Sequence, residues 1–195
     1  MTEQLSIPAP DVFLNGGLIL RAGDFELVPY HMDLAYDFLF AVGYESVQEY
    51  FLNRVLNFES AKAHIQKGID ECLEGKRLPW MIRHDERVIG AISLTDIVKP
   101  HRRGKPAYVF IEPKLQRQGI ALTAARAVTE WAFMSAGFHR LEADIAVDNG
   151  ASFQAAMELG FINEGVRRKH MYCGDGVYRD MANFAMLRED YLAAA

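Results

Sequence analysis

Apolar positions in the first half of the chain follow two different periods. Leu18–Arg21 and Phe25–Val28 have the short apolar runs of strands, and the glycine between them favours a turn. From His31 to Asn53, and again from Ser60 to Glu74, apolar residues recur every three or four positions, which is the spacing of a helix face. We therefore predict a strand hairpin followed by two helices, with Ser60 as the N-cap of the second helix and a glycine stop at its end.

After Pro79 the pattern changes to that of paired strands. Trp80–Arg83 and Arg87–Ile97 predict a hairpin that turns at Asp85-Glu86, and Gly90 marks a bulge or a close backbone approach. Downstream, the pattern predicts a basic loop, a strand, a helix, a strand, a short helix and two strands, over residues 99–105, 107–112, 120–136, 141–147, 151–159, 161–172 and 177–187, with a turn at 174–176. This mixed order predicts an α/β fold with helices on both faces of one sheet.

Length and composition fit one globular domain. The 195 residues are half apolar and about a quarter charged, which is ordinary for a soluble protein. We expect residues 1–17 to be a flexible lead-in and residues 18–195 to form a single domain. The sequence shows neither a long apolar run nor a basic start followed by an apolar segment. We therefore expect neither a membrane span nor a secretory signal, and a cytoplasmic location.

Charge and cysteine content narrow the classes of function. A net charge of −5 disfavours a general nucleic-acid binder, and two cysteines are too few for a disulfide framework or a zinc site. Cys72 falls in an apolar helical stripe and is expected in the core. The six histidines show no metal-ligand spacing, so we predict no metal. Two basic clusters, at 99–105 and 167–170, are either solvated loops or steer an anionic ligand such as a nucleotide phosphate.

The segment from Glu112 to Ala121 carries the most chemistry. A strand ends, a polar loop follows, and Gly119 precedes a helix. Such a junction directs unpaired backbone N–H groups and the positive end of the helix dipole toward one point, where a pyrophosphate can bind. Arg117 and Arg126 are candidates for further charge-assisted contacts. By physics alone, an ordinary strand–helix turn explains this segment equally well.

The same segment resembles that of a known family. Gln116-x-x-Gly119-x-Ala121 is similar to the Q/R-x-x-G-x-G/A acyl-CoA signature of the GNAT N-acetyltransferases. The resemblance implies a mixed, mostly antiparallel sheet of six to seven strands, and acetyl-CoA as the cosubstrate. In that family the loop binds the pyrophosphate, and the preceding strand pairs with the pantetheine. Carried over to this chain, the implied cofactor-binding residues are Phe110, Ile111, Glu112, Gln116, Arg117, Gln118, Gly119, Ile120 and Ala121.

Two further blocks narrow the resemblance. Asn149-x-x-Ser152, followed by Leu159-Gly160-Phe161-x-x-Glu164-Gly165, is similar to a pattern of the ribosomal-protein N-terminal acetyltransferase branch. The segment from residue 175 to residue 191 also resembles the last hairpin of that branch. This resemblance covers residues 18 to 191 and adds Asn149 and Ser152 to the implied cofactor contacts. It implies a protein N-terminal α-amine as the acceptor.

One position departs from the family pattern. Many GNAT enzymes have a tyrosine four residues before the glycine of the L-G-F segment, where it protonates the CoA thiolate, but this chain has Ala156 there. The resemblance to the ribosomal branch implies Ser152, one helical turn earlier, as the proton donor. The alternative is that Ser152 only caps or packs the helix.

The sequence defines the general base less well. Deprotonating the attacking amine at pH 7 costs about 1 kcal/mol for an α-amino group and over about 4 kcal/mol for a lysine. An N-terminal acceptor therefore needs no strong base. Glu142 and Asp144 share one side of a predicted strand, and Glu142 is our candidate base, acting through water. A salt-bridged strand face is the alternative for both, and Glu112 is a further candidate.

Three functions are compatible with these patterns. We predict an acetyltransferase acting on a protein N-terminus. The alternatives are an acetyltransferase for a small amine, such as a polyamine, an amino acid or an aminoglycoside, and a CoA-binding domain without turnover. Segments 29–58 and 97–106 and the last hairpin are expected to determine the acceptor. The expected partners are acetyl-CoA and the amine, with neither nucleic acid nor membrane, and a homodimer is the family expectation.

Overall fold

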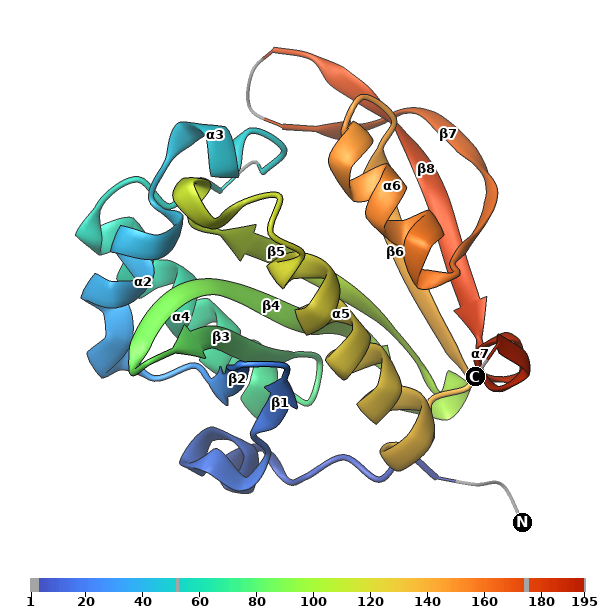
Figure 1. Ribbon diagram of the computed structural model, residues 1–195, viewed down its shortest axis with the longest axis horizontal. Helices are drawn as coiled ribbons and strands as arrows, with labels where there is room; N and C mark the ends of the chain where they lie inside the picture. The colour runs from blue at the N-terminus through green and yellow to red at the C-terminus, as the bar shows by residue number, and fades with distance from the viewer. Residues whose placement is uncertain (1–3, 52, 174–175, 195) are drawn as a thin grey trace.

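One mixed sheet organises the chain in the computed structural model, which describes residues 4–51, 53–173 and 176–194. Within these ranges the sheet has eight strands in the order β1-β2-β3-β4-β5-β6-β8-β7 (Figure 1). The strands are β1 (Leu20–Ala22), β2 (Phe25–Pro29), β3 (Leu78–His84), β4 (Arg87–Val98), β5 (Arg103–Ile111), β6 (Arg140–Ala146), β7 (Ile162–Tyr172) and β8 (Tyr178–Leu187). Neighbouring strands are antiparallel except β5 and β6, which are parallel. The α/β, mostly antiparallel class is confirmed. The sheet has more strands than the six to seven that the resemblance implies, and its first strand, β1, is the one predicted at Leu18–Arg21.

Helices cover both faces of the sheet, as predicted. They are α1 (Pro10–Val12), α2 (Ala35–Val42), α3 (Glu45–Gln48), α4 (Phe58–Leu73), α5 (Ile120–Glu130), α6 (Gly150–Leu159) and α7 (Arg188–Ala194). In Figure 1, α5 and α6 lie on one face, and α2 and α4 on the other. Trp80 and Ala124 belong to the apolar core on the α5 face, and Ile65 and Phe110 to that on the α4 face. Of the helices in the described ranges, none combines the length and apolar character needed to cross a bilayer.

The stretch from His31 to Asn53 is not one helix. α2 ends at Val42, Tyr44 is extended, and α3 is a single turn. The buried side chain of Gln48 explains the break, because its Nε2 donates to Val42 O (2.8 Å) and its Oε1 accepts from Val55 N (3.3 Å). These side-chain bonds take the place of backbone bonds that a continuous helix would make. The spacing of apolar residues in the sequence does not reveal a buried polar side chain that makes such hydrogen bonds.

α4 begins three residues earlier than predicted. Asn57 is its N-cap, since Asn57 Oδ1 accepts from Ser60 N (2.9 Å) while Ser60 Oγ accepts from Asn57 N (3.0 Å). This reciprocal pair is a capping box, so Ser60 is the third helical residue and not the N-cap. The predicted stop is confirmed, with Gly75 at φ +70°, and Cys72 is buried in the core as expected.

The segment before Leu18 packs on the sheet. Residues 13–17 form a wide helical turn, and Phe13 is fully buried with its ring edge-on to that of Trp80 at 5.2 Å. Trp80 Nε1 donates to Leu18 O (3.2 Å). One buried aromatic residue, Phe13, thus anchors part of the expected lead-in, although this segment has no periodic pattern.

The β3–β4 hairpin follows the prediction closely. Asp85 and Glu86 form the turn, both at positive φ, as a two-residue hairpin requires. At Gly90 the backbone of β4 comes so close to β5 that a Cβ would lie 2.2 Å from Phe110 O. The close approach expected at this glycine is confirmed.

Other boundaries differ more. β5 begins at Arg103, so Arg103 and Lys105 lie in a strand and not in the expected basic loop. Both side chains form ion pairs with β6, to Glu142 (2.9 Å) and Asp144 (2.9 Å), which brings these polar residues into the sheet. After α5 the chain forms a wider turn over residues 131–135. In the predicted turn at 174–176, residues 174 and 175 lie outside the described residues.

Candidate active site

α5 begins at an open N-terminus soon after β5. β5 ends at Ile111, a 3-10 turn follows at Pro113–Leu115, and Gly119 is the N-cap at φ +78°. Glycine supplies no capping side chain, and a Cβ on Gly119 would meet nothing within 4 Å. The first backbone N–H groups of α5 therefore face open space at the positive end of the helix dipole. Such a geometry binds phosphate groups.

Two glutamines shape the loop between the turn and α5. Gln116 Nε2 donates to Ile111 O (3.2 Å), and Gln118 Nε2 donates to Lys114 O (3.3 Å). Arg117 lies between them at φ +62°. The structure thus brings the residues of the acyl-CoA signature together in one loop and the first helical turn, with the glutamine side chains turned back onto the loop itself. These residues are Gln116, Arg117, Gln118, Gly119, Ile120 and Ala121.

β5 and β6 pair at one end and diverge toward the other. Their register covers Arg103–Gly104 and Arg140–Leu141, and beyond this point the two strands separate (Figure 1). Among the described residues, the rest of β5 has no register with β6. Its backbone on that side is therefore available to an extended ligand. The far end of this stretch is formed by Phe110, Ile111 and Glu112, next to the loop that leads into α5.

A bulge interrupts β5 in the diverging part. Two residues, Tyr108 and Val109, stand opposite the single residue Ile92 of β4, and Tyr108 has φ +53°. A bulge leaves its extra residue outside the ladder and re-aims nearby groups. The irregularity lies two residues from Phe110 on the predicted pantetheine strand.

α6 begins at the same edge of the sheet as α5, because β5 and β6 are parallel and each is followed by its own helix. Asn149 caps α6, with its Oδ1 accepting from Ser152 N (3.2 Å). The Ser152 side chain is exposed, whereas Ala156 one turn later is buried. The two helices lie side by side (Figure 1), and Arg126 of α5 pairs with Glu158 of α6 at 3.7 Å. Arg126 therefore has a carboxylate partner on the neighbouring helix.

The two basic clusters lie apart from this loop. The first is at the amino end of β5, where Lys105 pairs with Asp96 (3.3 Å) and Asp144 (2.9 Å). The second, Arg167–His170, lies on β7 at the edge of the sheet, where the register with β8 shifts between Arg167 and Met171. Ion pairs and an exposed strand edge account for these residues, and anion steering stays a prediction.

The candidate bases are engaged by cations. Glu142 accepts from Arg103 Nη1 (2.9 Å) and from Arg140 Nε (2.8 Å). Glu112 is buried, and its carboxylate pairs with Arg87 of β4. In both residues, guanidinium groups occupy carboxylate oxygens that a base would use to take up a proton. This geometry matches the salt-bridged alternative.

Asp144 is held in its ionised form. It pairs with Lys105 (2.9 Å) and Arg167 (2.6 Å) and accepts from Asn183 Nδ2 (2.7 Å). Burial raises the pKa of its carboxyl group, but the hydrogen bond and charge of Lys105, with Arg167, outweigh burial and leave the pKa below its usual value. Asp144 is therefore an anion that holds β5, β6 and β7 together.

A buried cationic and aromatic cluster lies on the α4 face, beside the bulge. Arg77 is 2% exposed, and its Nε and Nη2 donate to Ser93 Oγ (3.0 and 2.8 Å). Its Nη1 donates to Glu71 (3.2 Å). The guanidinium lies 4.5 Å from the ring centroid of Tyr108 and 5.6 Å from that of Tyr30. A buried charge thus supports the ring of the bulge residue.

Burial fixes the protonation state of two neighbours of Arg77. Burial, and then the charge of Arg77, lower the pKa of His64 to about 3, so its ring is neutral near pH 7. Burial raises the pKa of Tyr30 to about 12. Sequence analysis missed this cluster because an arginine between a helix and a strand is usually at the surface. Its burial depends on Ser93, 16 positions away.

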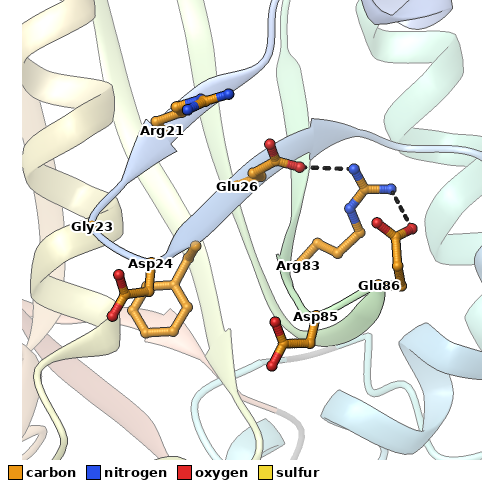
Figure 2. A pocket seen from close by; sticks show the side chains of 8 residues that line it. Arg21, Gly23, Asp24, Glu26, Arg83, Asp85 and Glu86 are labelled. Atoms are coloured by element: carbon orange, nitrogen blue, oxygen red, sulfur yellow. Dashed lines mark hydrogen bonds and ion pairs between the residues drawn. The ribbon is translucent and has the colours of Figure 1, made fainter.

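A pocket also opens at the β1–β2 and β3–β4 turns, away from the diverging strands. Figure 2 shows Arg83 between Glu26 (2.8 Å) and Glu86 (3.4 Å), with Asp24 and Asp85 on the two turns. A second pocket lies at the end of the helical segment after α5, around residues 134–137. Neither pocket is lined by a residue that the sequence indicates for catalysis or cofactor binding. Within the described residues, no group of three or more His, Cys, Asp or Glu side chains is placed to hold a metal ion.

Comparison with known proteins identifies the class that this fold and junction define. Residues 25–162 match the family described as acetyltransferase (GNAT) domain. YoaA of Bacillus subtilis (strain 168), described as an uncharacterized N-acetyltransferase, is 31% identical over 130 residues, which cover 66% of this chain and 73% of YoaA. The chain belongs to the GNAT family and is an acyl-CoA-dependent N-acetyltransferase by that membership.

Solved structures share the fold at low identity. A ribosomal L7/L12 alpha-N-protein acetyltransferase, RimL, in complex with coenzyme A has a TM-score of 0.77 at 19% identity, covering 87% of this chain and 98% of RimL. A chimera of the spermidine N-acetyltransferase SpeG from Vibrio cholerae and hSSAT has a TM-score of 0.70 at 20% identity, covering 87% of this chain and 99% of that chain. At these identities the likeness concerns the fold, and the two names denote different acceptors.

Proposed function

We propose that this chain transfers the acetyl group of acetyl-CoA to a primary amine, and that the amine is the α-amino group of a protein N-terminus. The observation that carries the proposal is the open, glycine-capped start of α5 beside two parallel strands that diverge. The first feature accepts a pyrophosphate and the second accepts an extended arm. Together they match the pyrophosphate and the pantetheine arm of a coenzyme A molecule.

The proposed cofactor contacts are mainly those of the backbone. The N–H groups of residues 117–121 bind the pyrophosphate, and the backbone of Phe110–Glu112 pairs with the pantetheine. Phe110 and Ile111 are both buried, so their side chains hold the strand in place beside the proposed ligand. Acetyl-CoA supplies the activated acetyl thioester. Asn149 and Ser152 approach it from the start of α6.

Ser152 is the proposed proton donor to the departing thiolate. Its backbone N–H is used by the cap, and its hydroxyl is on an exposed first turn of α6. Ala156 cannot donate a proton, so Ser152 is the hydroxyl that the α6 start offers. This role is compatible with the helix cap, because Asn149 accepts from the backbone N–H of Ser152 and so orients the turn that carries the hydroxyl.

The ion pairs of two carboxylates support the choice of an α-amine. Glu142 and Asp144 both pair with cationic side chains, which leaves neither carboxylate free to act as a base or to bind a polycation. An α-amine loses its proton at pH 7 for about 1 kcal/mol, whereas a lysine or polyamine nitrogen needs over about 4 kcal/mol. RimL is named for an alpha-N-protein substrate, which supports the same choice. Polyamines are the second candidate, since SpeG shares the fold.

Calorimetric titration of acetyl-CoA tests the cofactor half of the proposal. Gly119→Glu places a carboxylate where the pyrophosphate would lie and should weaken binding by about 10- to 1,000-fold. Gly16→Glu is the matched control, because Gly16 also has positive φ and open space around its Cβ. Equal affinity in Gly119→Glu and the unaltered protein would remove the loop from the cofactor site.

An acceptor screen tests the other half. Peptides with a free N-terminus, the same peptides with a blocked N-terminus and a lysine side chain, and spermidine are compared at pH 7. Acetylation of the free N-terminus supports the proposal, and preferential acetylation of spermidine supports the second candidate. Binding of acetyl-CoA with no turnover of any amine would indicate a CoA-binding domain.

A further inference from the structure

The bulge in β5 holds a bulky residue in a backbone conformation that such residues seldom adopt. Tyr108 has φ +53° and, together with Val109, stands opposite the single residue Ile92 of β4. For a residue with a Cβ, the left-handed region costs free energy, because the Cβ lies too close to the following carbonyl oxygen. The conformation therefore persists only where the surrounding groups determine it.

Contacts of the Tyr108 ring on the α4 face supply this restraint. The guanidinium of Arg77 lies 4.5 Å from the ring centroid, within the range of a cation–π interaction. The Phe51 ring stacks on the Tyr108 ring at 5.6 Å between centroids, and the His64 ring meets it nearly edge-on at 5.9 Å. Side chains from three separate segments therefore hold one ring, and Arg77 has the shortest of these distances.

Arg77 is itself held from two sides. Its Nε and Nη2 donate to Ser93 Oγ, and its Nη1 donates to Glu71 of α4. Ser93 is fully buried on β4, where it pairs with Ala107, the residue before the bulge. The Arg77 side chain therefore connects α4 and β4 with the bulge of β5.

The strand is fixed on both sides of the bulge. Before it, Ala107 pairs with Ser93, and after it Phe110 pairs with Ala91. A bulge re-aims the groups near it. The conformation of Tyr108 therefore sets the direction of the short stretch of backbone between these two fixed points.

This stretch lies where the acyl end of the cosubstrate is expected. In the proposed function, the pyrophosphate binds at the start of α5 and the pantetheine pairs with residues 110–112, so the thioester extends toward residues 108–109. Here, among the described residues, β5 has no register with β6, and its backbone on that side is available to the thioester. A different conformation of the bulge would misplace the acetyl group without altering the loop that leads into α5.

We propose that Arg77 is a positioning residue for acetyl transfer: through the ring of Tyr108, it holds the bulge of β5 in the conformation that aligns the thioester for attack by the amine. This inference rests on the proposed function. Because Arg77 is only 2% exposed, it acts on the reaction through its neighbours and not by contact with a substrate.

A double-mutant cycle on Arg77 and Tyr108 tests the inference. Arg77→Met keeps most of the side-chain volume and removes the guanidinium, and Glu71, which is 32% exposed, can then be solvated by water. Tyr108→Gly introduces a residue that adopts positive φ at no steric cost, so the bulge no longer needs the ring. A fourth protein carries both substitutions. Lys76→Met, at the exposed preceding residue, is the matched control.

Steady-state acetylation of the best amine of the screen and calorimetric titration of acetyl-CoA are measured where each variant is folded. Arg77→Met should lower kcat by about 10- to 100-fold, as expected for a misplaced reacting group, and should change acetyl-CoA affinity by less than about 3-fold. Added to Tyr108→Gly, the same substitution should lower kcat by less than about 3-fold, because the bulge no longer depends on the ring. Lys76→Met should match the unaltered protein in both measurements.

Hydrogen exchange reports the bulge independently of turnover. The backbone N–H groups of residues 107–110 should exchange faster in Arg77→Met than in Lys76→Met, because the restraint on the ring is lost. Unchanged exchange at these residues would overturn the inference.

A second variant covers the case in which Arg77→Met does not fold. Ser93→Ala is a smaller change that removes the acceptor of two guanidinium hydrogen bonds. It should lower kcat by about 3- to 10-fold, and this loss should disappear when Tyr108→Gly is also present. A Ser93→Ala variant with unchanged kcat would count against the positioning role of Arg77.

The kinetic outcomes separate the two proposals. A role of Arg77 in stability alone would leave kcat per folded molecule unchanged in Arg77→Met, which overturns the inference and leaves the proposed function standing. An equal loss of kcat with and without Tyr108→Gly also overturns it, because Arg77 would then not act through the bulge. An unaltered protein that binds acetyl-CoA but acetylates no amine of the screen overturns the proposed function, and the role of Arg77 with it.

Discussion

The two sides of the candidate site differ in how their parts are distributed along the chain. The cofactor side is one continuous stretch, Phe110–Ala121, in which a strand end, a 3-10 turn and a glycine N-cap follow one another. The side proposed to receive the acceptor is assembled from Phe51, Arg77 and Tyr108, which come from three separate segments and meet through side-chain contacts.

This difference explains why one side leaves a pattern in the sequence and the other does not. In a continuous backbone site, each residue type is required by its own conformation, as Gly119 is by its positive φ. In a site formed by side chains from distant segments, each position accepts any residue whose size and polarity fit the side chains that it contacts. Substitutions on the cofactor side should therefore change ligand binding, whereas those on the acceptor side should change stability and turnover.

Arg77→Ala gives the strongest test of that comparison. The substitution removes a buried charge with its bonds to Ser93 and Glu71 and leaves a space beneath Tyr108. Loss of one partner from a buried polar network should lower the free energy of unfolding by about 3–5 kcal/mol. Urea unfolding followed by tryptophan fluorescence measures this change.

Lys76→Ala is the matched control for Arg77. Lys76 is the preceding residue, is exposed and pairs with the exposed Glu74, so its loss should lower the free energy of unfolding by under about 1 kcal/mol. If Arg77→Ala were no less stable than Lys76→Ala, the acceptor side would not depend on tertiary assembly in the way proposed.

Sequence patterns predicted most strands and helices because these have long apolar periods. They failed where a single side chain decides the structure. Gln48 breaks the predicted helix with two hydrogen bonds, and Phe13 anchors a segment without any period. The loop that resembles the acyl-CoA signature could be recognised in the sequence because its residues are consecutive. The contact between Tyr50 and Asp148 could not, since these residues lie 98 positions apart.

Ser152→Ala sharpens the comparison on the catalytic side. Asn149 binds the backbone N–H of residue 152, so the helix cap survives the substitution while the hydroxyl is lost. If Ser152 donates the proton, kcat should fall by about 100-fold and acetyl-CoA affinity should stay the same. Ser135→Ala, at an exposed serine after α5, serves as the control. A kcat equal to that of the control would assign Ser152 to the cap alone.

Glu142→Gln should have the smallest effect, although Glu142 was the base suggested by the sequence. Its two oxygens accept from Arg103 and Arg140 near the paired end of β5 and β6, so neither oxygen is free to meet the amine or a water molecule. An α-amine at pH 7 needs about 1 kcal/mol to lose its proton. We therefore expect kcat to change by less than about 3-fold, in a pH–rate profile that keeps its shape. A fall of about 10-fold or more, with loss of the acidic limb of that profile, would make Glu142 the base. The carboxylate would then act despite its ion pairs, and the chemistry would extend beyond the continuous cofactor segment into the side-chain network of the sheet.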